Sequence, residues 1–434
     1  MGKKKIIILG GGLAGLSVAW HLQKKGVDCR ILEMNPRVGG LCRSKQINGF
    51  TFDYCGHLLH FRNSYSFNLV NNLLKNNLGE HKKSAWIYSY GKFSRYPFQA
   101  NLYGLPEAVV KECLLGLILA SRNGRLKNKT NTNFLEWCNH VFGDGITRHF
   151  MTPYNTKFWT LSPKHLSCDW LEGFVPVPSL DQVVEGTITE SQRQFGYNAR
   201  FWYPREGGIN SFCMALASQI KNINTGCQVT EIDLLNKQIE INSRTKEGFD
   251  FLISTIPLPE MPCLIKGMPK KTMALFDKLR WNSIFNLNLG ISDCCDKGQH
   301  WVYFPQQEIS FFRVGFPHNF SSRSVPKDKS SLYVEVAYSK KKPIDKNNII
   351  LRIKNDLIGV GILKKGAKID CQDTNDIKYG YPIYDLNYKS TRGAIMKFLE
   401  KNDIAVCGRY GSWRYMSMED TLMDALRLAK TVKA

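Results

Sequence analysis

A glycine-rich turn between a strand and a helix near the start of the chain limits the fold more than any other sequence feature. Residues 6–9 are apolar and β-branched, as in a buried parallel strand. Gly10-Gly11-Gly12-Leu13-Ala14-Gly15 follows and matches the pattern G-x-G-x-x-G. A segment with helical periodicity comes next, and a second apolar strand ends at Glu33. This order predicts the first β-α-β unit of a doubly wound α/β domain.

The residues of this turn suit the binding of a dinucleotide. Gly10 allows the tight turn, Gly12 lets a pyrophosphate approach the backbone, and Gly15 lets the helix pack closely on the strand. The start of the helix offers unpaired N–H groups and the positive end of its dipole to the phosphates. Glu33 stands about 20 residues further on, where a carboxylate accepts hydrogen bonds from the adenosine ribose. A carboxylate there favours a 2′-hydroxyl over a 2′-phosphate.

A second glycine turn follows Glu33 and narrows the choice of cofactor. It reads Asn35-Pro36-Arg37-Val38-Gly39-Gly40-Leu41-Cys42-Arg43-Ser44. A dehydrogenase that binds only a nicotinamide cofactor does not need this turn. The two turns together resemble the FAD-binding start of flavoproteins of the amine-oxidase and protoporphyrinogen-oxidase group. The resemblance implies FAD as the cofactor, with contacts from Gly40, Arg43, Ser44, Gly56, Val229, Gly408 and Asp420.

The charge of the chain favours anionic ligands but does not indicate a nucleic-acid-binding surface. Lys and Arg number 59 against 37 Asp and Glu, which gives a net charge of +22. The basic residues are spread along the chain in short clusters such as Lys3–Lys5, so we expect a solvated basic surface. No apolar stretch reaches the ~18 residues of a membrane span. Thirteen scattered cysteines without zinc-ligand spacing favour reduced thiols in a cytoplasmic protein, and no metal site is expected.

The remaining pattern predicts an α/β fold with a Rossmann-like FAD-binding domain, a helical insert domain and an antiparallel β-sheet domain. Residues 63–194 have mainly helical character, and alternating segments between 261 and 362 indicate an antiparallel sheet. A strand near residue 404 and a helix from about Met418 close the chain. We therefore assign residues 1–95, 203–260 and 365–434 to the FAD-binding domain, 96–202 to a helical domain that covers the substrate, and 261–364 to the sheet domain.

Segments spread over nearly the whole chain resemble one family, the eukaryotic type of UDP-galactopyranose mutases. Tyr96-Pro97-Phe98-Gln99 matches the motif on the uridine side, and residues 153–159 (PYNTKFW) match the segment that lines the nucleotide pocket. Residues 197–201 (YNARF) resemble a mobile loop whose asparagine reaches the sugar. The other matching segments are Trp301–Pro305, Phe312–Arg313, Tyr381–Pro382 and Gly408–Tyr415.

This resemblance implies an isomerase that interconverts the pyranose and furanose forms of a nucleotide-sugar without net redox change. Reduced FAD (FADH−) would act through N5 as the nucleophile at the anomeric carbon, and NAD(P)H or another reductant would only activate the flavin. It implies catalytic roles for His57, Asn198, Arg313 and Arg409. Substrate contacts are implied for Tyr96, Gln99, Asn155, Trp159, Phe174, Tyr303, Tyr381 and Tyr415. Homo-oligomerisation is left open.

The match breaks at positions that would contact the substrate. Phe174 stands where the family carries an arginine on a mobile loop that helps to hold the diphosphate, and Thr152 replaces a second family arginine. A phenyl ring in place of a guanidinium removes a charge and two aligned donors, although Arg62 could restore some of the charge. The substrate could therefore be another nucleotide-sugar, with a different base, a different sugar or a single phosphate.

Two further hypotheses stay open. An FAD-dependent oxidase or desaturase of the amine-oxidase type would consume oxygen and would have an apolar tunnel to the flavin. The polar segments that carry tyrosines and arginines argue against this hypothesis. A flavin-binding protein that has lost catalysis would explain Phe174, but it would not explain why Arg313 and the tyrosines are present.

Overall fold

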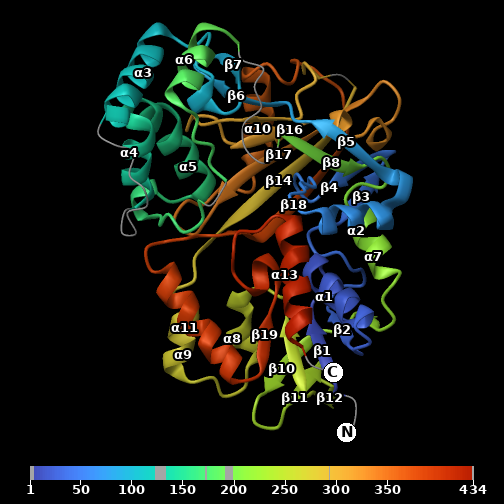
Figure 1. Cartoon of the computed structure of the whole chain (residues 1–434). Helices are drawn as coiled ribbons and strands as arrows, with labels where there is room; N and C mark the ends of the chain where they lie inside the picture. Colours follow the sequence, from blue (N-terminus) through green and yellow to red (C-terminus); the bar gives the residue numbers. More distant parts are fainter. Residues whose placement is uncertain (1–3, 123–132, 172–173, 191–198, 293, 433–434) are drawn as a thin grey trace.

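The structure, a computed structural model, describes residues 4–122, 133–171, 174–190, 199–292 and 294–432. A parallel sheet in the lower half of Figure 1 and a larger sheet in the upper half organise these residues. The described strands of the parallel sheet have the order β19-β13-β1-β2-β9. Their bounds are Ile404–Val406 (β19), Phe251–Ser254 (β13), Ile6–Leu9 (β1), Arg30–Glu33 (β2) and Ile223–Thr225 (β9).

The two faces of the parallel sheet are buried in different cores. Ile6 and Ile8 pack with helices α1, α7 and α13. Ile7 and Leu9 point to the other face, toward the sheet β10-β11-β12 and helices α8, α9 and α11. Burial on both faces explains why β1 is a continuous apolar run. The helices are Leu13–Lys24 (α1), Asn210–Ala217 (α7), Met261–Leu264 (α8), Lys270–Phe276 (α9), Tyr388–Lys401 (α11) and Met418–Thr431 (α13), and the strands are Val229–Asp233 (β10), Gln238–Ile241 (β11) and Thr245–Gly248 (β12).

The larger sheet has the order β18-β14-β17-β16-β15-β6-β7 within the described residues. Its neighbouring strands are antiparallel except for β15 and β6, which are parallel. Helix α10 (Ile349–Gly359) covers an apolar face of this sheet. The strands are Ile369–Pro382 (β18), Trp281–Ile291 (β14), Ser330–Tyr338 (β17), Arg313–Gly315 (β16), Trp301–Tyr303 (β15), Ala85–Ser89 (β6) and Lys92–Arg95 (β7).

Helices α3 to α6 form the helical region beside the larger sheet (Figure 1). Their bounds are Glu107–Arg122 (α3), Phe134–Ile146 (α4), Thr152–Trp159 (α5) and Leu180–Ile188 (α6). Shorter elements are Ser44–Ile47 (β3) paired with Phe50–Asp53 (β4), Leu78–Lys82 (β5) paired with Arg200–Pro204 (β8), Ser64–Leu74 (α2) and Gly408–Gly411 (α12). Within the described part of the chain, no helix combines the length and the apolar character needed to cross a membrane.

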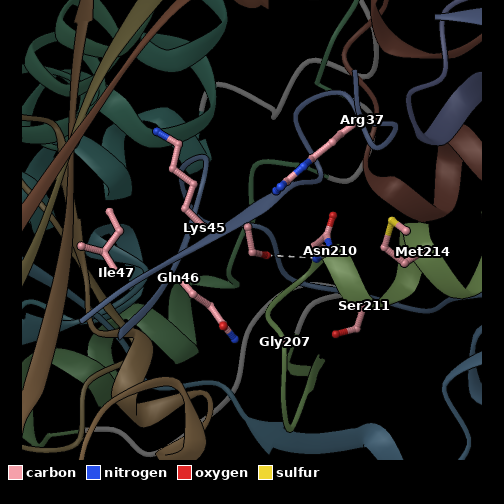
Figure 2. Close-up of a pocket in the computed structure, with 9 residues that line it drawn as sticks. Arg37, Lys45, Gln46, Ile47, Gly207, Asn210, Ser211 and Met214 are labelled. Carbon is pink, nitrogen blue, oxygen red and sulfur yellow. Dashed lines mark hydrogen bonds between the residues drawn. The ribbon is translucent and has the colours of Figure 1, made fainter. Parts of the chain in front are cut away.

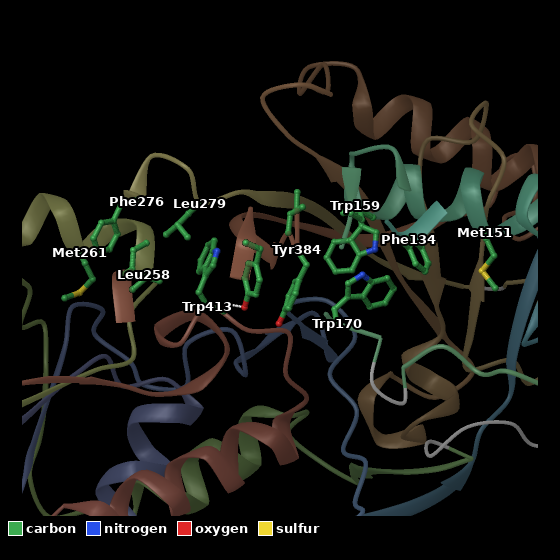
Figure 3. Close-up of a cluster of buried hydrophobic side chains, with 14 of the residues drawn as sticks. Phe134, Met151, Trp159, Trp170, Leu258, Met261, Phe276, Leu279, Tyr384 and Trp413 are labelled. Atoms are coloured by element: carbon green, nitrogen blue, oxygen red, sulfur yellow. Dashed lines mark hydrogen bonds between the residues drawn. The ribbon is translucent and has the colours of Figure 1, made fainter. Parts of the chain in front are cut away.

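One apolar cluster joins the helical region to the lower half of the molecule (Figure 3). Met151 and Phe134 lie at the helical end of the row, followed by Trp159 and Trp170, and Met261 lies at the other end. Tyr384 and Trp413 fill the middle, between the two halves. The helical region is therefore packed against the rest of the chain by buried aromatic rings, which contribute large apolar areas.

The structure confirms the α/β class, with a parallel sheet and a largely antiparallel sheet, and it corrects the helical character expected for residues 63–194. Strands β5, β6 and β7 interrupt that stretch between residues 78 and 95. Alternate residues of β6 are fully and partly buried, a strand pattern that its mixture of polar and aromatic residues obscures in the sequence. The domain limits at residues 95 and 364 stay a proposal, and the larger sheet draws β6, β7 and β18 from beyond them.

Two glycines inside helices give a test of this packing. A Cβ on Gly186 in α6 would lie 1.8 Å from the carbonyl oxygen of Ala100, whereas a Cβ on Gly393 in α11 would meet no atom within 4 Å. We expect Gly186→Ala to destabilise the chain by about 1–3 kcal/mol because the two backbone segments must move apart. Gly393→Ala, the matched control, should be neutral or stabilising by up to about 1 kcal/mol. Urea unfolding measures both, and an unchanged midpoint for Gly186→Ala would contradict the packing.

Candidate active site

The first glycine turn forms a cradle with no room for side chains. Gly10 has a φ of 96°, which a residue with a side chain rarely adopts. A Cβ on Gly15 would lie 2.0 Å from the carbonyl oxygen of Gly10, so α1 starts directly against the end of β1. Gly12, the residue before α1, provides no side-chain cap for the helix. The N–H groups at the start of α1 are therefore suited to a phosphate.

Glu33, at the end of β2, is 5% exposed and is anchored beside this cradle. One carboxylate oxygen accepts a hydrogen bond from the N–H of Gly11 at 2.6 Å. The other accepts from the backbone and side-chain N–H groups of Asn35, at 2.8 and 2.6 Å. A carboxylate oxygen has two lone pairs, so the oxygen bonded to Gly11 can accept a further hydrogen bond from a ribose hydroxyl.

The two glycine turns are in direct contact. The N–H of Gly39 donates to the carbonyl oxygen of Gly11 at 2.8 Å. A Cβ on Gly40, where φ is 57°, would lie 3.1 Å from the Cα of Gly12. Arg43 donates from Nε to the carbonyl oxygen of Gly40 at 2.7 Å, which fixes its side chain on the second turn. The structure thus brings together the predicted cofactor residues of both turns.

A pocket of about 710 Å³ lies beside the second turn (Figure 2). Its lining comes from Arg37 and Ser44 of that turn, from β3, from Gly207 and from α7. The N–H of Asn210 donates to the Ser44 hydroxyl at 3.1 Å within it. Of the residues predicted to contact the cofactor, Ser44 alone lines this pocket within the described chain.

Three other predicted cofactor residues lie in different surroundings. Gly408 packs closely on the first turn of α1, because a Cβ there would lie 2.4 Å from a side-chain atom of that turn. The Asp420 carboxylate accepts from the N–H of Ser417 at 2.8 Å, closing a capping box on α13, and it also pairs with Arg62. Val229 begins β10 and is partly buried. Arg62, which could have supplied substrate charge, is thus engaged with a carboxylate.

His57 lies in the segment that follows β4. Burial, followed by the positive charge of Arg409, lowers the pKa of His57 to about 4, so its ring is neutral at pH 7. Its Nδ1 atom is enclosed and has no hydrogen-bond partner among the described residues. The preceding Gly56 has no space for a side chain, since a Cβ would lie 2.4 Å from the hydroxyl of Tyr333. An enclosed, unpartnered nitrogen beside a glycine is the kind of position that a bound cofactor would complete.

Arg409 is held between two of the predicted substrate tyrosines. Its guanidinium carbon lies 5.3 Å from the ring centres of both Tyr381 and Tyr415. The two rings are 5.7 Å apart, and Nε of Arg409 donates to the carbonyl oxygen of Met416 at 2.8 Å. Cation–π contacts and a backbone acceptor therefore fix this guanidinium.

Arg313 is fixed by the register of three neighbouring strands. Tyr303 of β15 is paired with Arg313 of β16, which in turn is paired with Glu335 of β17. Glu335 is 2% exposed and forms an ion pair with the Arg313 guanidinium. Burial alone would lower the pKa of Arg313, but the Glu335 carboxylate and nearby tyrosines, Tyr381 among them, outweigh burial and raise it above its usual value.

The predicted uridine-side tyrosine, Tyr96, also contacts this group. The ring of Tyr96 lies 5.3 Å from that of Tyr303. The Nζ atom of Lys83 lies 5.1 Å from the centre of the Tyr96 ring. Lys83 is 5% exposed, and burial lowers its pKa to about 8. A third cation, after Arg409 and Arg313, therefore lies near the Tyr96 end of the site.

Four predicted substrate residues are engaged with protein groups. The Gln99 and Asn155 amides donate to backbone carbonyl oxygens at 2.7 and 2.8 Å, and both side chains are buried. Trp159 is buried with its ring 6.2 Å from that of Tyr415. Phe174 packs on the same tyrosine with ring centres 4.6 Å apart. Asn198, the predicted sugar contact, lies outside the described residues.

Three further residues complete this group and were not predicted from the sequence. Glu335 is a lone acid in an apolar strand, a signal that a buried partner is needed. Tyr154 and Phe158 are four residues apart on α5, and such spacing places two rings on one helix face. The ring of Tyr154 lies 5.5 Å from that of Tyr303, and the ring of Phe158 lies 4.7 Å from that of Tyr381.

Comparison with known proteins first defines the class. The model of the flavin-containing amine oxidoreductase family matches residues 13–342, and the chain belongs to this family. An L-amino-acid oxidase of Crotalus adamanteus is 24% identical over 259 residues, which are 56% of this chain and 47% of that protein. An uncharacterised protein of Methanothermococcus thermolithotrophicus is 46% identical over 59 residues, 14% of this chain and 57% of that protein. The chain thus spans less than two thirds of the length of these curated relatives.

A more specific likeness extends over almost the whole chain. The crystal structure of a reduced UDP-galactopyranose mutase superposes with a TM-score of 0.92 and 28% sequence identity. The match covers 98% of this chain and 95% of that chain. The chain therefore resembles UDP-galactopyranose mutase, as the sequence motifs predict.

Family membership implies a flavin, and the residues present fit FAD. The Gly10–Gly15 cradle and the open start of α1 suit its pyrophosphate. Glu33 suits its adenosine ribose. The enclosed Nδ1 of His57 lies beside Arg409, where the isoalloxazine would be bordered by polar groups.

The buried ion pair of the site gives a stability prediction. Glu335→Gln should destabilise the chain by about 3–5 kcal/mol, because it leaves the buried Arg313 guanidinium without its counter-charge. Glu80→Gln is the matched control, since Glu80 pairs with Arg200 and both side chains are largely exposed. We expect it to change stability by less than about 1 kcal/mol. Denaturant unfolding compares the two, and equal small losses would show that the Glu335 pair contributes little.

Proposed function

We propose that this chain is a flavin-dependent mutase that interconverts the pyranose and furanose forms of a nucleotide-sugar, in the manner of UDP-galactopyranose mutase. The likeness to a reduced UDP-galactopyranose mutase over 98% of the chain is the observation that carries the proposal. When bound, reduced FAD would supply a nucleophilic nitrogen at the anomeric carbon, with no net oxidation of the sugar. The chain itself would bind and orient the nucleotide-sugar and stabilise its phosphates.

The phosphates of the nucleotide leave the sugar in the proposed reaction. Two fixed arginines and the neutral hydroxyls of three tyrosines would hold these phosphates. Arg313 and Arg409 are positioned by the protein before any ligand binds, so little reorganisation is needed. Burial raises the pKa of Tyr303, Tyr381 and Tyr415, which keeps their hydroxyl groups protonated at neutral pH. Protonated hydroxyls donate hydrogen bonds to phosphate oxygens, which supports a phosphate-binding role.

His57 would act as a neutral group beside the flavin. Its pKa of about 4 excludes a second positive charge next to Arg409 at pH 7. A neutral imidazole can accept or donate one hydrogen bond at Nδ1, according to its tautomer. We assign to it the orientation of the cofactor rather than acid–base transfer to the sugar.

An oxidase is the second candidate, because the family includes amine oxidoreductases and an L-amino-acid oxidase is a partial relative. An oxidase or desaturase of the amine-oxidase type would need an apolar tunnel for the substrate to the flavin. The closely placed Arg313, Arg409 and tyrosines favour a phosphorylated ligand instead.

A reduction-dependent assay tests the proposed function. The purified holoenzyme is reduced with dithionite under anaerobic conditions and incubated with UDP-galactopyranose and a panel of other nucleotide-sugars. We expect a furanose product, detected by anion-exchange chromatography, from the reduced but not the oxidised enzyme.

A variant of the phosphate-binding arginine gives a second test in the same assay. Arg313→Lys should lower kcat by about 10²–10³-fold through loss of the planar donor group. The exposed Arg352→Lys is the control and should leave kcat unchanged. Oxygen uptake with an amine and no product from any nucleotide-sugar would favour the oxidase.

Phe174 gives a test of substrate choice. Phe174→Arg places a guanidinium beside Tyr415, where the family has an arginine, and it should tighten UDP-galactose binding by about tenfold or more, the value of one charged hydrogen bond. Phe174→Leu, the matched control, shortens the side chain without adding charge and should not tighten binding. Titration of the reduced flavin spectrum measures the affinity. If Phe174→Arg binds UDP-galactose no better than wild type, this position does not set the substrate.

A further inference from the structure

A mixed cluster of cysteine, aspartate and histidine lies in two connections of the larger sheet and includes none of the residues assigned to the active site. Cys294 and Asp296 belong to the connection between β14 and β15. His318 belongs to the short 3₁₀ helix Pro317–Asn319, between β16 and β17. The three side chains are partly buried, with His318 and Asp296 13% and 14% exposed. Two separate chain connections thus bring one sulfur, one oxygen and one nitrogen to the same point.

The distances between these atoms match the spacing of ligands around one metal ion. The Sγ atom of Cys294 lies 2.9 Å from Oδ2 of Asp296 and 3.8 Å from Nε2 of His318, and the last two atoms are 3.0 Å apart. The circle through these three positions has a radius of about 1.9 Å, and zinc bonds to nitrogen, oxygen and sulfur are about 2.0–2.3 Å long. An ion slightly above the plane of the three atoms would be at bonding distance from each after shifts of a few tenths of an ångström.

Neighbouring groups orient two of these three side chains. The Nδ1 atom of His318 lies 3.1 Å from both the carbonyl oxygen and the backbone nitrogen of Ser331, and these contacts fix the ring with Nε2 toward the other two ligand atoms. In the tautomer that carries its proton on Nδ1, the Nε2 lone pair is directed at them. The Oδ1 atom of Asp296 accepts from the N–H of Gly298 at 2.8 Å and from the side-chain amide of Asn319 at 3.0 Å. Oδ2 therefore points into the cluster. Such outer hydrogen bonds commonly fix histidine and carboxylate ligands of metal sites.

We propose that Cys294, Asp296 and His318 bind one divalent transition metal ion of the Zn²⁺ class. A thiolate with an imidazole suits zinc and related ions rather than Mg²⁺ or Ca²⁺, which prefer oxygen ligands. Without an ion, the Cys294 thiol donates a hydrogen bond to Oδ2 of Asp296 at 2.9 Å. A bound ion would take the place of that proton, which would leave to the solvent. The ion would link the connection before β15 to the connection after β16. It would thereby fasten the two strands that carry Tyr303 and Arg313.

Metal analysis and X-ray absorption test this proposal on the full-length protein. The protein is stripped with a chelator, loaded with Zn²⁺, desalted and analysed for bound zinc. We expect one zinc per chain, with a zinc K-edge spectrum that contains one sulfur and two or three nitrogen or oxygen ligands. The spectrum of the wild-type protein decides the ligand set even if a variant fails to fold.

Variants then identify the ligands. Cys294→Ser and His318→Gln should each weaken zinc binding, measured by competition with a chromophoric chelator, by about tenfold or more, since loss of an outer partner alone costs about 10–100-fold. Cys295→Ser is the matched control, because Cys295 is the adjacent, exposed cysteine and should not change binding. Three results would overturn the proposal: no zinc retained after desalting, a zinc spectrum without sulfur, or an equal loss in Cys295→Ser and Cys294→Ser.

Discussion

The close approach of α1 to the end of β1 is the constraint on which the cofactor side of the molecule depends. A Cβ on Gly15 would lie 2.0 Å from the carbonyl oxygen of Gly10, so the helix can start there only without a side chain. The second turn then rests on the first through the hydrogen bond from Gly39 to Gly11. Both turns are thus fixed by backbone contacts, which hold the directions of their N–H groups. Preorganised donors of this kind suit a tightly held dinucleotide.

On the substrate side, side chains rather than backbone groups form the site, and the register of the larger sheet fixes their positions. Tyr303, Arg313 and Glu335 are cross-strand neighbours on β15, β16 and β17. Burying an arginine is costly unless a carboxylate accompanies it, and Glu335 meets that need while remaining 2% exposed. The Glu335 carboxylate accepts from Nε, and the Tyr303 side chain also hydrogen-bonds the guanidinium. A guanidinium has five N–H donors, so further donors can meet an anion. The pairing of β16 with its two neighbouring strands therefore fixes the backbone position of Arg313 in the site.

Short sequence motifs predict the elements of the cofactor side that are contiguous in the chain. The glycine spacing predicts the β1–α1–β2 unit, and a carboxylate three residues after Ser417 is a capping signal that marks the start of α13. Contacts between residues far apart in the chain, in strand pairs and ion pairs, could not be predicted from such motifs. Strands β5 to β7 carry charged and aromatic residues whose pattern becomes clear only when β6 is seen beside β15. The partnership of Arg313 with Glu335 joins residues 22 positions apart, through strand register that no short motif encodes.

The same limit explains why no cysteine motif indicated the cluster at Cys294. Its proposed ligands come from two connections, with Cys294 and His318 24 residues apart, which meet because β15 and β16 are adjacent.

The two ends of the candidate active site differ in the charged groups that surround them. Phe174 packs on Tyr415 without charge, whereas Lys83 lies beside Tyr96 with a pKa of about 8. A phosphate near Lys83 would favour its charged form. Anion binding at the Tyr96 end would therefore be coupled to proton uptake around and above pH 8. At the other end, the positive charges of Arg409 and Arg313 act on Tyr415.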